Sequence, residues 1–241
     1  MEETSILGID TSSSELGVAL ARNGSAVCGV SRYLRNSHSE HIASAAHYVF
    51  ECAGVGAENV DGIAVSVGPG SFTGLRVGIA FVKGFCLKRN IPVFPVSSLE
   101  CAALSWNRFR EAEIVCAFNA RRGRVFRARF TVSAGTLMRS TPDQLTDIDA
   151  FAQEIRPGDI VLTDQQGSSK DERFARLNEK PGVYSLTETP TQRALACALK
   201  ISRDLSRGAA RPCPAASLEP VYLCPSYTEE KSTPRETGCS S

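Results

Sequence analysis

The sequence predicts an α/β protein built from two similar units, each with a mixed sheet and flanking helices. Two observations support this prediction. Patterns typical of buried strands alternate with patterns typical of amphipathic helices, and a strand–turn–strand opening occurs twice, near residue 5 and near residue 113. The 241 residues suffice for two units with separate cores. We expect the units to cover 1–108 and 109–223, and the polar residues 224–241 to form a disordered tail.

The first unit is expected to begin with three strands. The apolar run at 5–10 and the alternating pattern at 15–22 predict the first two, and Asn23-Gly24 is a hairpin signal that leads into a third at 26–33. Ser39 suits the cap of a helix over 40–53. A strand, a glycine-rich loop, a helix, a strand and a helix then follow over 61–67, 68–70, 72–88, 91–96 and 97–107.

The second unit is expected to repeat this opening. Strands are predicted at 113–118 and 124–132, on either side of a turn at 121–123. The later pattern predicts a helix at 143–155, a strand at 159–163 and a long helix from Pro190 to about 207, because proline suits the first turn of a helix. The polar stretch 165–180 has only a weak pattern.

Composition and charge describe an ordinary globular protein. The net charge is +1 and 42% of the residues are hydrophobic, so nothing in the whole chain indicates attraction to nucleic acid or to a membrane surface. No segment is long and apolar enough to span a bilayer. The acidic start, Met1-Glu2-Glu3, lacks the features of a secretory signal, so we expect a cytoplasmic protein.

Neither the cysteines nor the histidines predict a metal site. The nine cysteines include no Cys-x-x-Cys pair, and their odd number without an export signal predicts reduced thiols. Cys86 and Cys116 lie in apolar runs and are expected to be buried. His38 and His41 are spaced like two ligands on one helical turn, but no third ligand is evident, and Ser39 between them is better explained as a cap.

The end of the first strand has two interpretations. Asp10 is followed by the hydroxyl side chains of Thr11 and Ser12, and a carboxylate with hydroxyls at a strand end suits a magnesium-bound phosphate. The same residues also suit an ordinary Asx turn. Any nucleotide binding, as Mg-ATP or Mg-ADP, is therefore expected to be weak, and we expect no resident cofactor.

The loop Gly68-Pro69-Gly70-Ser71 lies between a predicted buried strand and a helix, where free N–H groups could bind an anion. It lacks the lysine of a phosphate-binding loop and the third glycine of a dinucleotide fingerprint. The alternative is a tight turn in which Ser71 caps the helix. The helix at 72–88 is apolar on two faces, so it is buried either inside this chain or against a second protein.

Arginines line the second predicted hairpin. Arg127 and Arg129 alternate with Phe126, Ala128 and Phe130, so one face of that strand is apolar and the other is basic. The basic face is either a phosphate-binding surface or a solvated strand face. We found no pairing of a nucleophile with a base that would predict a catalytic residue.

Six segments together resemble the TsaB family, also called YeaZ, in their order and spacing. They are Ile-Leu-Gly-Ile-Asp-Thr-Ser (6–12), His-Ser-Glu-His (38–41), Gly-Pro-Gly-Ser-Phe-Thr-Gly-Leu-Arg-Val-Gly (68–78), Val-Ser-Ser-Leu (96–99), Asn-Ala-Arg-Arg-Gly-Arg-Val-Phe (119–126) and Glu-Pro-Val-Tyr-Leu (219–223). The resemblance implies a duplicated actin-like (ASKHA) fold. It also implies a non-catalytic scaffold of the machinery that places threonylcarbamoyl on adenosine 3′ of the anticodon in tRNA.

The partners that the resemblance implies are the transferase TsaD and the ATPase TsaE, with tRNA reached through the complex and a homodimer possible without TsaD. TsaB proteins bind TsaD through the helices after the first meander and after the glycine loop. Carried over to this chain, the partner interface comprises Ile42, Ala46, Val49, Phe50, Gly70, Ser71, Phe72, Thr73, Gly74, Arg76, Val77, Gly78 and Phe81.

The chain departs from the family pattern at the second hairpin. Asn119, Arg124 and Phe126 stand where the family usually has aspartate, glutamate and tyrosine. The loss of two carboxylates argues against one alternative, an independent actin-fold nucleotide-binding enzyme, because a magnesium-phosphate site would use those carboxylates. A second alternative, a peptidase-like protein, would need a nucleophile or a metal constellation, and none is evident.

Overall fold

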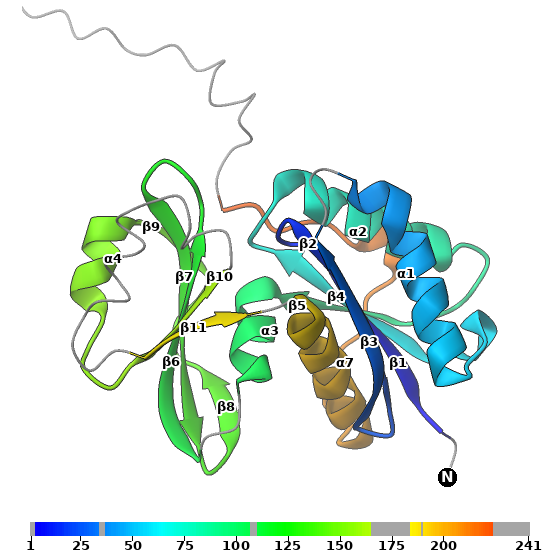
Figure 1. Cartoon of the computed structure of the whole chain (residues 1–241). Coiled ribbons are helices and arrows are strands. Elements are labelled where there is room, and N and C mark those ends of the chain that lie inside the picture. Colours follow the sequence, from blue (N-terminus) through cyan, green and yellow to red (C-terminus); the bar gives the residue numbers. More distant parts are fainter. Residues whose placement is uncertain (1–2, 34–36, 107–109, 165–183, 189, 224–241) are drawn as a thin grey trace, which may run out of the picture.

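The fold consists of two mixed sheets, each flanked by helices. The computed structural model describes residues 3–33, 37–106, 110–164, 184–188 and 190–223. The first sheet has the order β3-β2-β1-β4-β5 and the second β11-β10-β6-β7-β8, with β9 paired to β7. These two sheets confirm the predicted α/β class (Figure 1).

The strands of the first sheet are β1 (Ser5–Asp10), β2 (Glu15–Arg22), β3 (Ser25–Tyr33), β4 (Gly62–Gly68) and β5 (Val93–Ser97). Those of the second are β6 (Glu111–Asn119), β7 (Arg124–Ser133), β8 (Thr136–Arg139), β9 (Gln144–Asp147), β10 (Ile160–Asp164) and β11 (Tyr184–Glu188). The helices are α1 (His38–Ala53), α2 (Phe72–Phe85), α3 (Ser98–Ser105), α4 (Ile148–Glu154) and α7 (Pro190–Ser206), with short 3-10 turns at Ala57–Asn59 and Ala215–Ser217.

The two sheets repeat one topology, as the doubled hairpin predicted. In the first sheet, β1 pairs antiparallel with β2 and parallel with β4. In the second, β6 pairs antiparallel with β7 and parallel with β10. Asp10 and Asn119 therefore occupy equivalent places, at the end of the first strand of each sheet.

Helices cover both faces of the first sheet. Side chains of a strand alternate between its faces, so Leu7 and Ile9 of β1 pack in a core with α1 and α2, whereas Ile6 packs with Cys197 and Ala198 of α7. Figure 1 shows α3 and α7 between the two sheets. The same alternation directs Asp10 to the face that α7 covers.

The expected division at residue 109 is wrong for the C-terminal part of the chain. Helix α7 packs on β1 and β2, and a Cβ at Gly8 of β1 would overlap the carbonyl oxygen of Ala194 in α7. Further on, the amide of Val221 donates to the carbonyl of Val67 at 2.7 Å. The first unit therefore comprises the chain up to α3 together with residues 190–223, because the apolar side of α7 is buried by the first sheet.

Several helix boundaries differ from the predictions. α1 begins at His38 after Ser37, so Ser39 lies inside the helix and is not its cap. α2 ends at Phe85, and Lys88, which was expected inside the helix, has a positive φ of 63°. The predicted helix at 143–155 is a strand followed by a short helix, because the carboxylate of Asp147 caps α4 by accepting from the amide of Asp149. The predicted tail at 224–241 and the whole of 165–180 lie outside the described residues.

Candidate functional site

The carboxylate at the end of β1 is buried and engaged on both oxygens. Oδ1 of Asp10 accepts from the amide and the hydroxyl of Ser12, at 2.8 and 2.7 Å. Oδ2 accepts from Nε of Arg193 at 2.6 Å. The bond from the amide of Ser12 is the signature of an Asx turn, so the structure has the second of the two arrangements considered for this segment.

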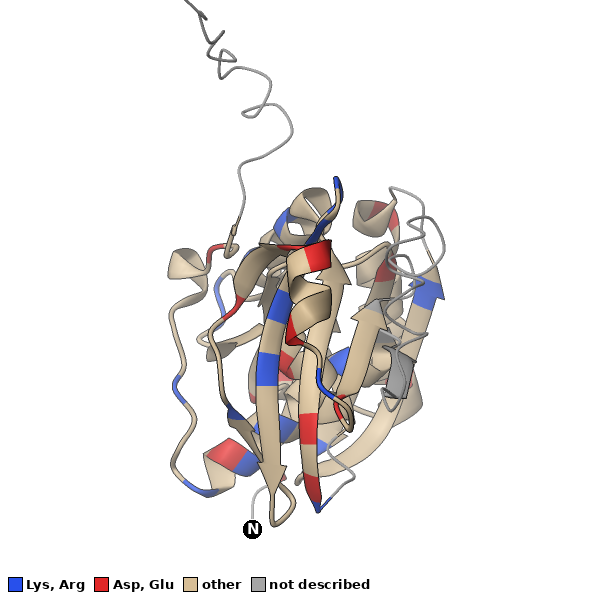
Figure 2. Cartoon of the chain, turned by 90° about the vertical axis from the view of Figure 1, so that its left-hand side faces the viewer, with Lys and Arg blue, Asp and Glu red and all other residues tan. Residues whose placement is uncertain are grey.

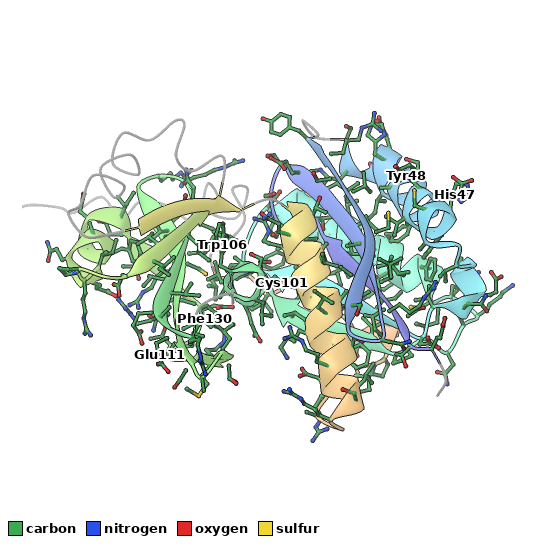
Figure 3. The ribbon with its side chains drawn as sticks, turned by 60° about the horizontal axis from the view of Figure 1, so that its bottom comes forward. His47, Tyr48, Cys101, Trp106, Glu111 and Phe130 are labelled. Carbon is green, nitrogen blue, oxygen red and sulfur yellow. A yellow bond between two sulfur atoms is a disulfide. The ribbon has the colours of Figure 1, made fainter. Side chains whose placement is uncertain are left out.

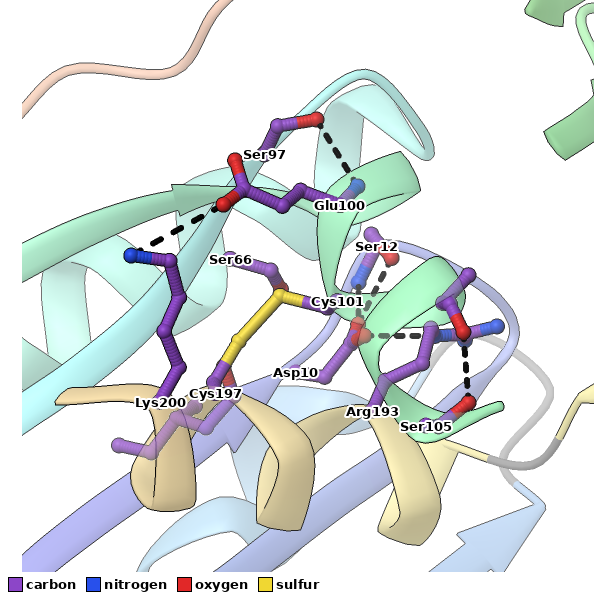
Figure 4. Close-up of a disulfide and its surroundings, with 12 residues drawn as sticks. Asp10, Ser12, Ser66, Ser97, Glu100, Cys101, Ser105, Arg193, Cys197 and Lys200 are labelled. Carbon is purple, nitrogen blue, oxygen red and sulfur yellow. Dashed lines mark hydrogen bonds and ion pairs between the residues drawn. A yellow bond between two sulfur atoms is a disulfide. The ribbon is translucent and has the colours of Figure 1, made fainter. Parts of the chain in front are cut away.

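Arg193 reaches this carboxylate from α7. Its side chain is 1% exposed and that of Asp10 is 0% exposed. A second guanidinium nitrogen donates to the hydroxyl of Ser13 at 2.9 Å, and the guanidinium carbon lies 5.3 Å from the ring centre of Phe118 in β6. Figure 4 shows the pair beside the disulfide between α3 and α7. Sequence reasoning missed Arg193, because a single arginine in an amphipathic helix gives no sign that it points inward.

Glu15 lies in the same neighbourhood. Its side chain is buried at the start of β2, and burial raises the pKa of this carboxyl, while the nearby Arg193 guanidinium lowers it by a smaller amount. The end of β1 thus holds two carboxylates and one guanidinium in a region closed to water.

The glycine loop closes on the first turn. The amide of Ser71 donates to the carbonyl of Ser12 at 2.6 Å, and a Cβ at Gly70 would overlap that same carbonyl. The hydroxyl of Ser71 accepts from the amide of Gly74 at 3.2 Å. These bonds match the interpretation as a tight turn with a serine cap, because the amides of Ser71 and Gly74 donate within the chain.

Gly74 and Gly78 face the interior of the chain. A Cβ at Gly74 would overlap the carbonyl oxygen of Thr11, and one at Gly78 would overlap the Thr11 hydroxyl. The assignment of these two glycines to a partner interface is therefore wrong. They permit the close approach of α2 to the first turn instead.

The predicted interface stripe of α1 is also interior. Ile42, Ala46, Val49 and Phe50 belong to the core beneath α1 and are at most 8% exposed. Their assignment to a partner interface is wrong, because the apolar stripe of an amphipathic helix is the side that packs on its own sheet. The exposed side of α1 carries His47 and Tyr48, which project away from the sheet (Figure 3).

The rest of the predicted interface lies at the surface. Ser71, Thr73 and Arg76 are exposed, and Gly70, Phe72, Val77 and Phe81 are half-buried. We define the outer stripe of α2 as the face with helical spacing that is open to solvent, comprising Thr73, Arg76, Val77, Ala80, Phe81 and Gly84. Small and apolar side chains predominate in this stripe.

An aromatic cluster extends the outer stripe of α2 at its N-terminal end. The ring of Phe72 stacks on Tyr222 with centroids 4.4 Å apart. Arg76 lies 3.8 Å over the Phe72 ring and donates from Nε to the Tyr222 hydroxyl at 2.9 Å. Tyr222 is 40% exposed, so residues from the C-terminal part of the chain contribute to this surface. The local sequence around Tyr222 gives no sign of this contact, because Phe72 and Tyr222 are far apart in the chain.

The turn at the end of β6 has the same hydrogen-bond pattern as the turn at the end of β1, but without the charge. Oδ1 of Asn119 accepts from the amide of Arg121 at 2.6 Å, which matches the bond from Ser12 to Asp10. The uncharged amide of Asn119 replaces the carboxylate. The two strand ends therefore share one turn geometry and differ in charge.

The basic face of β7 is neutralised by acidic partners. Arg129 forms two hydrogen bonds with Asp159, at 2.8 and 2.9 Å, and these bonds are the main cause that raises the pKa of this guanidinium. Arg127 pairs with Glu154 at 3.1 Å. Figure 2 shows acidic and basic residues interspersed on this side of the molecule. The paired arginines favour a solvated strand face over a phosphate-binding one.

The prediction that the cysteines are reduced thiols is wrong for one pair. Cys101 of α3 and Cys197 of α7 form a disulfide whose Cα atoms are 5.5 Å apart. Cys86 and Cys116 are buried and lie outside the disulfide, as predicted. No spacing in the sequence could reveal the bonded pair, because its members are 96 positions apart and meet only when α7 folds back.

Within the described residues, no group of three or more His, Cys, Asp or Glu side chains could hold a metal ion. His38 is buried, whereas Nδ1 of His41 lies 3.2 Å from a guanidinium nitrogen of Arg32. The described helices include none with the length and apolar character to cross a membrane.

The sequence is similar to proteins of threonylcarbamoyladenosine biosynthesis. The family model of TsaD, tRNA N6-adenosine threonylcarbamoyltransferase, matches residues 31–205. The chain is 35% identical over 139 residues to the Bacillus subtilis tRNA threonylcarbamoyladenosine biosynthesis protein TsaB, covering 58% of this chain and 60% of that protein. It is 30% identical to the TsaB protein of Buchnera aphidicola, covering 74% of this chain and 87% of the relative. The chain thus spans less than two thirds of the Bacillus protein.

Solved structures show the same fold. YeaZ from Pseudomonas aeruginosa superimposes with a TM-score of 0.73 at 24% identity, covering 91% of this chain and all of that one. The ROK hexokinase of Thermus thermophilus superimposes with a TM-score of 0.50 at 11% identity, covering 85% of this chain and 100% of that one. The duplicated sheets are those of the actin-like fold.

Proposed function

The chain belongs to the TsaB (YeaZ) family, and on that premise we propose that it is a non-catalytic subunit of the machinery that forms threonylcarbamoyladenosine in tRNA. In this proposal the chain binds and stabilises TsaD, the transferase, in the cytoplasm. TsaE joins the pair, and tRNA is reached through the complex. The match to the TsaD family model fits a paralogue of the transferase.

The outer stripe of α2 is the observation that carries this proposal. A helix that is buried on one side by Thr11 and the first sheet still has Ala80 exposed and Val77 and Phe81 only half-buried on its other side. Contiguous apolar surface rimmed by polar residues is a feature of protein interaction sites. TsaD is the partner we assign to it, and a second copy of the chain is the partner in the absence of TsaD.

The strand ends support a role without catalysis. The Asp10 carboxylate is engaged by Ser12 and Arg193, and the equivalent position in the second sheet is Asn119. Neither residue offers a free carboxylate oxygen to a magnesium-bound phosphate.

An omission assay tests the proposal. Purified chain, TsaD and TsaE are incubated with tRNA and the threonylcarbamoyl donor, and each protein is left out in turn while modified adenosine is measured by mass spectrometry. We expect no product without TsaD and strongly reduced product without this chain. Product formed by this chain alone, or full product in its absence, would contradict the proposal.

A further inference from the structure

At the end of β1, the guanidinium of Arg193 lies at a group of side chains that would also suit a bound metal ion. Ligands of α/β proteins bind beyond the carboxyl ends of the strands, and a carboxylate with neighbouring hydroxyls suits a hard cation such as Mg²⁺. Asp10, Ser12 and Ser13 provide those groups. The guanidinium of Arg193 nevertheless lies against the carboxylate, 2.6 Å from Oδ2.

The contacts of Arg193 are those of a built site. Its nitrogens donate to Asp10 and to the hydroxyl of Ser13, and both Arg193 and Asp10 are almost completely buried. The second carboxylate oxygen is already used by two groups of Ser12. Both oxygens of Asp10 therefore already accept hydrogen bonds, and the buried guanidinium of Arg193 lies where a metal ion on Oδ2 would lie.

The position of Arg193 also joins the two units. The residue belongs to α7, which packs on the first sheet, and its guanidinium lies over Phe118, which belongs to the second sheet. Cys197, one helical turn further along α7, is bonded to Cys101 of α3, which belongs to the same unit as α7 (Figure 4). Many proteins of two units close around a ligand bound between them. In this chain the side chain of Arg193 reaches from the first unit to Phe118 of the second.

We propose that Arg193 is an internal ligand, whose guanidinium takes the place of a divalent cation at Asp10 and holds the two units together without nucleotide. This proposal concerns the isolated chain and is independent of TsaD binding. It makes two demands: the wild-type chain takes no Mg-nucleotide at Asp10, and the vacated site accepts a small cation once the Arg193 side chain is removed.

The first test uses the unaltered chain. Its melting temperature is measured with and without about 5 mM Mg-ATP or Mg-ADP, and we expect a shift below about 1 °C, since only a ligand that binds the folded state raises it. A rise of several degrees that disappears in Asp10→Asn would overturn the proposal. This arm needs no variant of Arg193.

The second test is chemical rescue. Arg193→Ala is expected to melt about 10 °C lower, because it leaves a buried carboxylate unpaired. About 20 mM guanidinium chloride should then raise the melting temperature of Arg193→Ala by a few degrees, and leave the wild type unchanged or slightly lower. A rise caused by Mg²⁺ alone in this variant also supports the proposal. A folded Arg193→Ala that responds to neither cation overturns it.

Two control variants sharpen the rescue. Arg203→Ala removes an arginine from the exposed side of the same helix, so it should melt within about 2 °C of the wild type and show no rescue. Arg193→Lys keeps the charge but not the planar fork, so it should melt between the wild type and Arg193→Ala and gain nothing from guanidinium. If Arg193→Ala does not fold, the proposal is tested by the melting temperatures of Arg193→Lys and of the wild type with Mg-nucleotide. A rise in the melting temperature of Arg193→Lys caused by guanidinium would then contradict the proposal.

Discussion

Nε of Arg193 lies 2.6 Å from Oδ2 of Asp10, although the two residues are 183 positions apart in the chain. The pair fixes α7 across the end of β1, and both side chains are removed from water. A buried pair of this kind adds little stability over apolar residues of the same shape, but the loss of one member leaves an unpaired charge. The pair should therefore respond strongly to single substitutions and weakly to a double one.

Asp10→Asn should lower the free energy of unfolding by about 3–5 kcal/mol, because it leaves the guanidinium of Arg193 without its anion. The double variant Asp10→Asn/Arg193→Met should lose clearly less than the sum of the two single variants. Urea unfolding of all four proteins gives the coupling energy as a double-mutant cycle. Additive losses would show that the two residues act independently.

Two glycines of α2 form a matched pair for a test of packing. Gly74→Ala places a methyl group against the main-chain carbonyl of Thr11, which cannot move by a side-chain rotation, and should destabilise the fold by about 1–3 kcal/mol. Gly84→Ala meets open space and should stabilise it by about 0.5–1 kcal/mol, because alanine is the better helix former. Thermal unfolding measures both, and equal effects would refute this placement of α2.

The topology could be predicted because it rests on local patterns. The Asn23-Gly24 hairpin, the alternation in β2 and the buried runs of β1 and β4 are each visible over a few residues. The repeat of the opening at β6 and β7 predicted the second sheet in the same way. β8 and β11 escaped prediction, and both are short strands at the edges of the second sheet.

The side on which each residue lies could not be predicted in the same way. Gly74 and Gly78 look the same in sequence whether they face a partner helix or Thr11, and only the packing of α2 on the first turn decides. Arg193 and Cys197 lie near Asp10 and Cys101 only because α7 packs on the first sheet, and this packing is not evident from the sequence. Contacts between distant segments depend on the tertiary fold, which periodicity does not specify.

Glu15 should produce a measurable pH dependence. Burial raises the pKa of this carboxyl above its unfolded value, so in the window just above the unfolded pKa of about 4.5 the folded chain binds more protons than the unfolded one. The contribution of Glu15 to stability therefore falls as the pH rises through that window. Relative to the wild type, Glu15→Gln should be more favourable at pH values near 7 than near 4. Urea unfolding at both pH values measures this difference, and a change of the opposite sign would show that the attraction to Arg193 outweighs burial.

The Cys101–Cys197 bond should respond to reductant. It closes a loop that contains the whole second sheet, since the bonded residues are 96 positions apart, so it restricts the unfolded chain. We expect reductant to lower the melting temperature of the wild type by several degrees, since disulfides typically contribute about 2–4 kcal/mol, and to leave Cys101→Ser unchanged. Cys52→Ser, which removes an exposed free thiol, serves as the control and should behave as the wild type. Alkylation of both Cys101 and Cys197 in unfolded, unreduced protein would contradict the bond.

The outer stripe of α2 gives the most direct test of partner binding. Ala80 lies in the middle of this stripe with its methyl group in solvent, so Ala80→Arg adds a long charged side chain without disturbing the core. If TsaD packs on this face, the substitution forces a charge into a desolvated apolar contact, and we expect affinity to fall at least about tenfold, which corresponds to about 1.4 kcal/mol. The same variant should weaken self-association in the absence of TsaD.

Ala209→Arg is the matched control for this test, because it makes the same exchange at an exposed alanine in the loop after α7. Both variants should keep the circular dichroism spectrum and the melting temperature of the wild type, since surface substitutions of this kind usually change stability by less than about 0.5 kcal/mol. Binding to TsaD is measured by analytical ultracentrifugation and by titration calorimetry. A folded Ala80→Arg that binds TsaD as tightly as Ala209→Arg does would place the interface elsewhere. In that case the exposed side of α1, with His47 and Tyr48, is the next surface to substitute, since it is the other part of the predicted helix pair that is open to solvent.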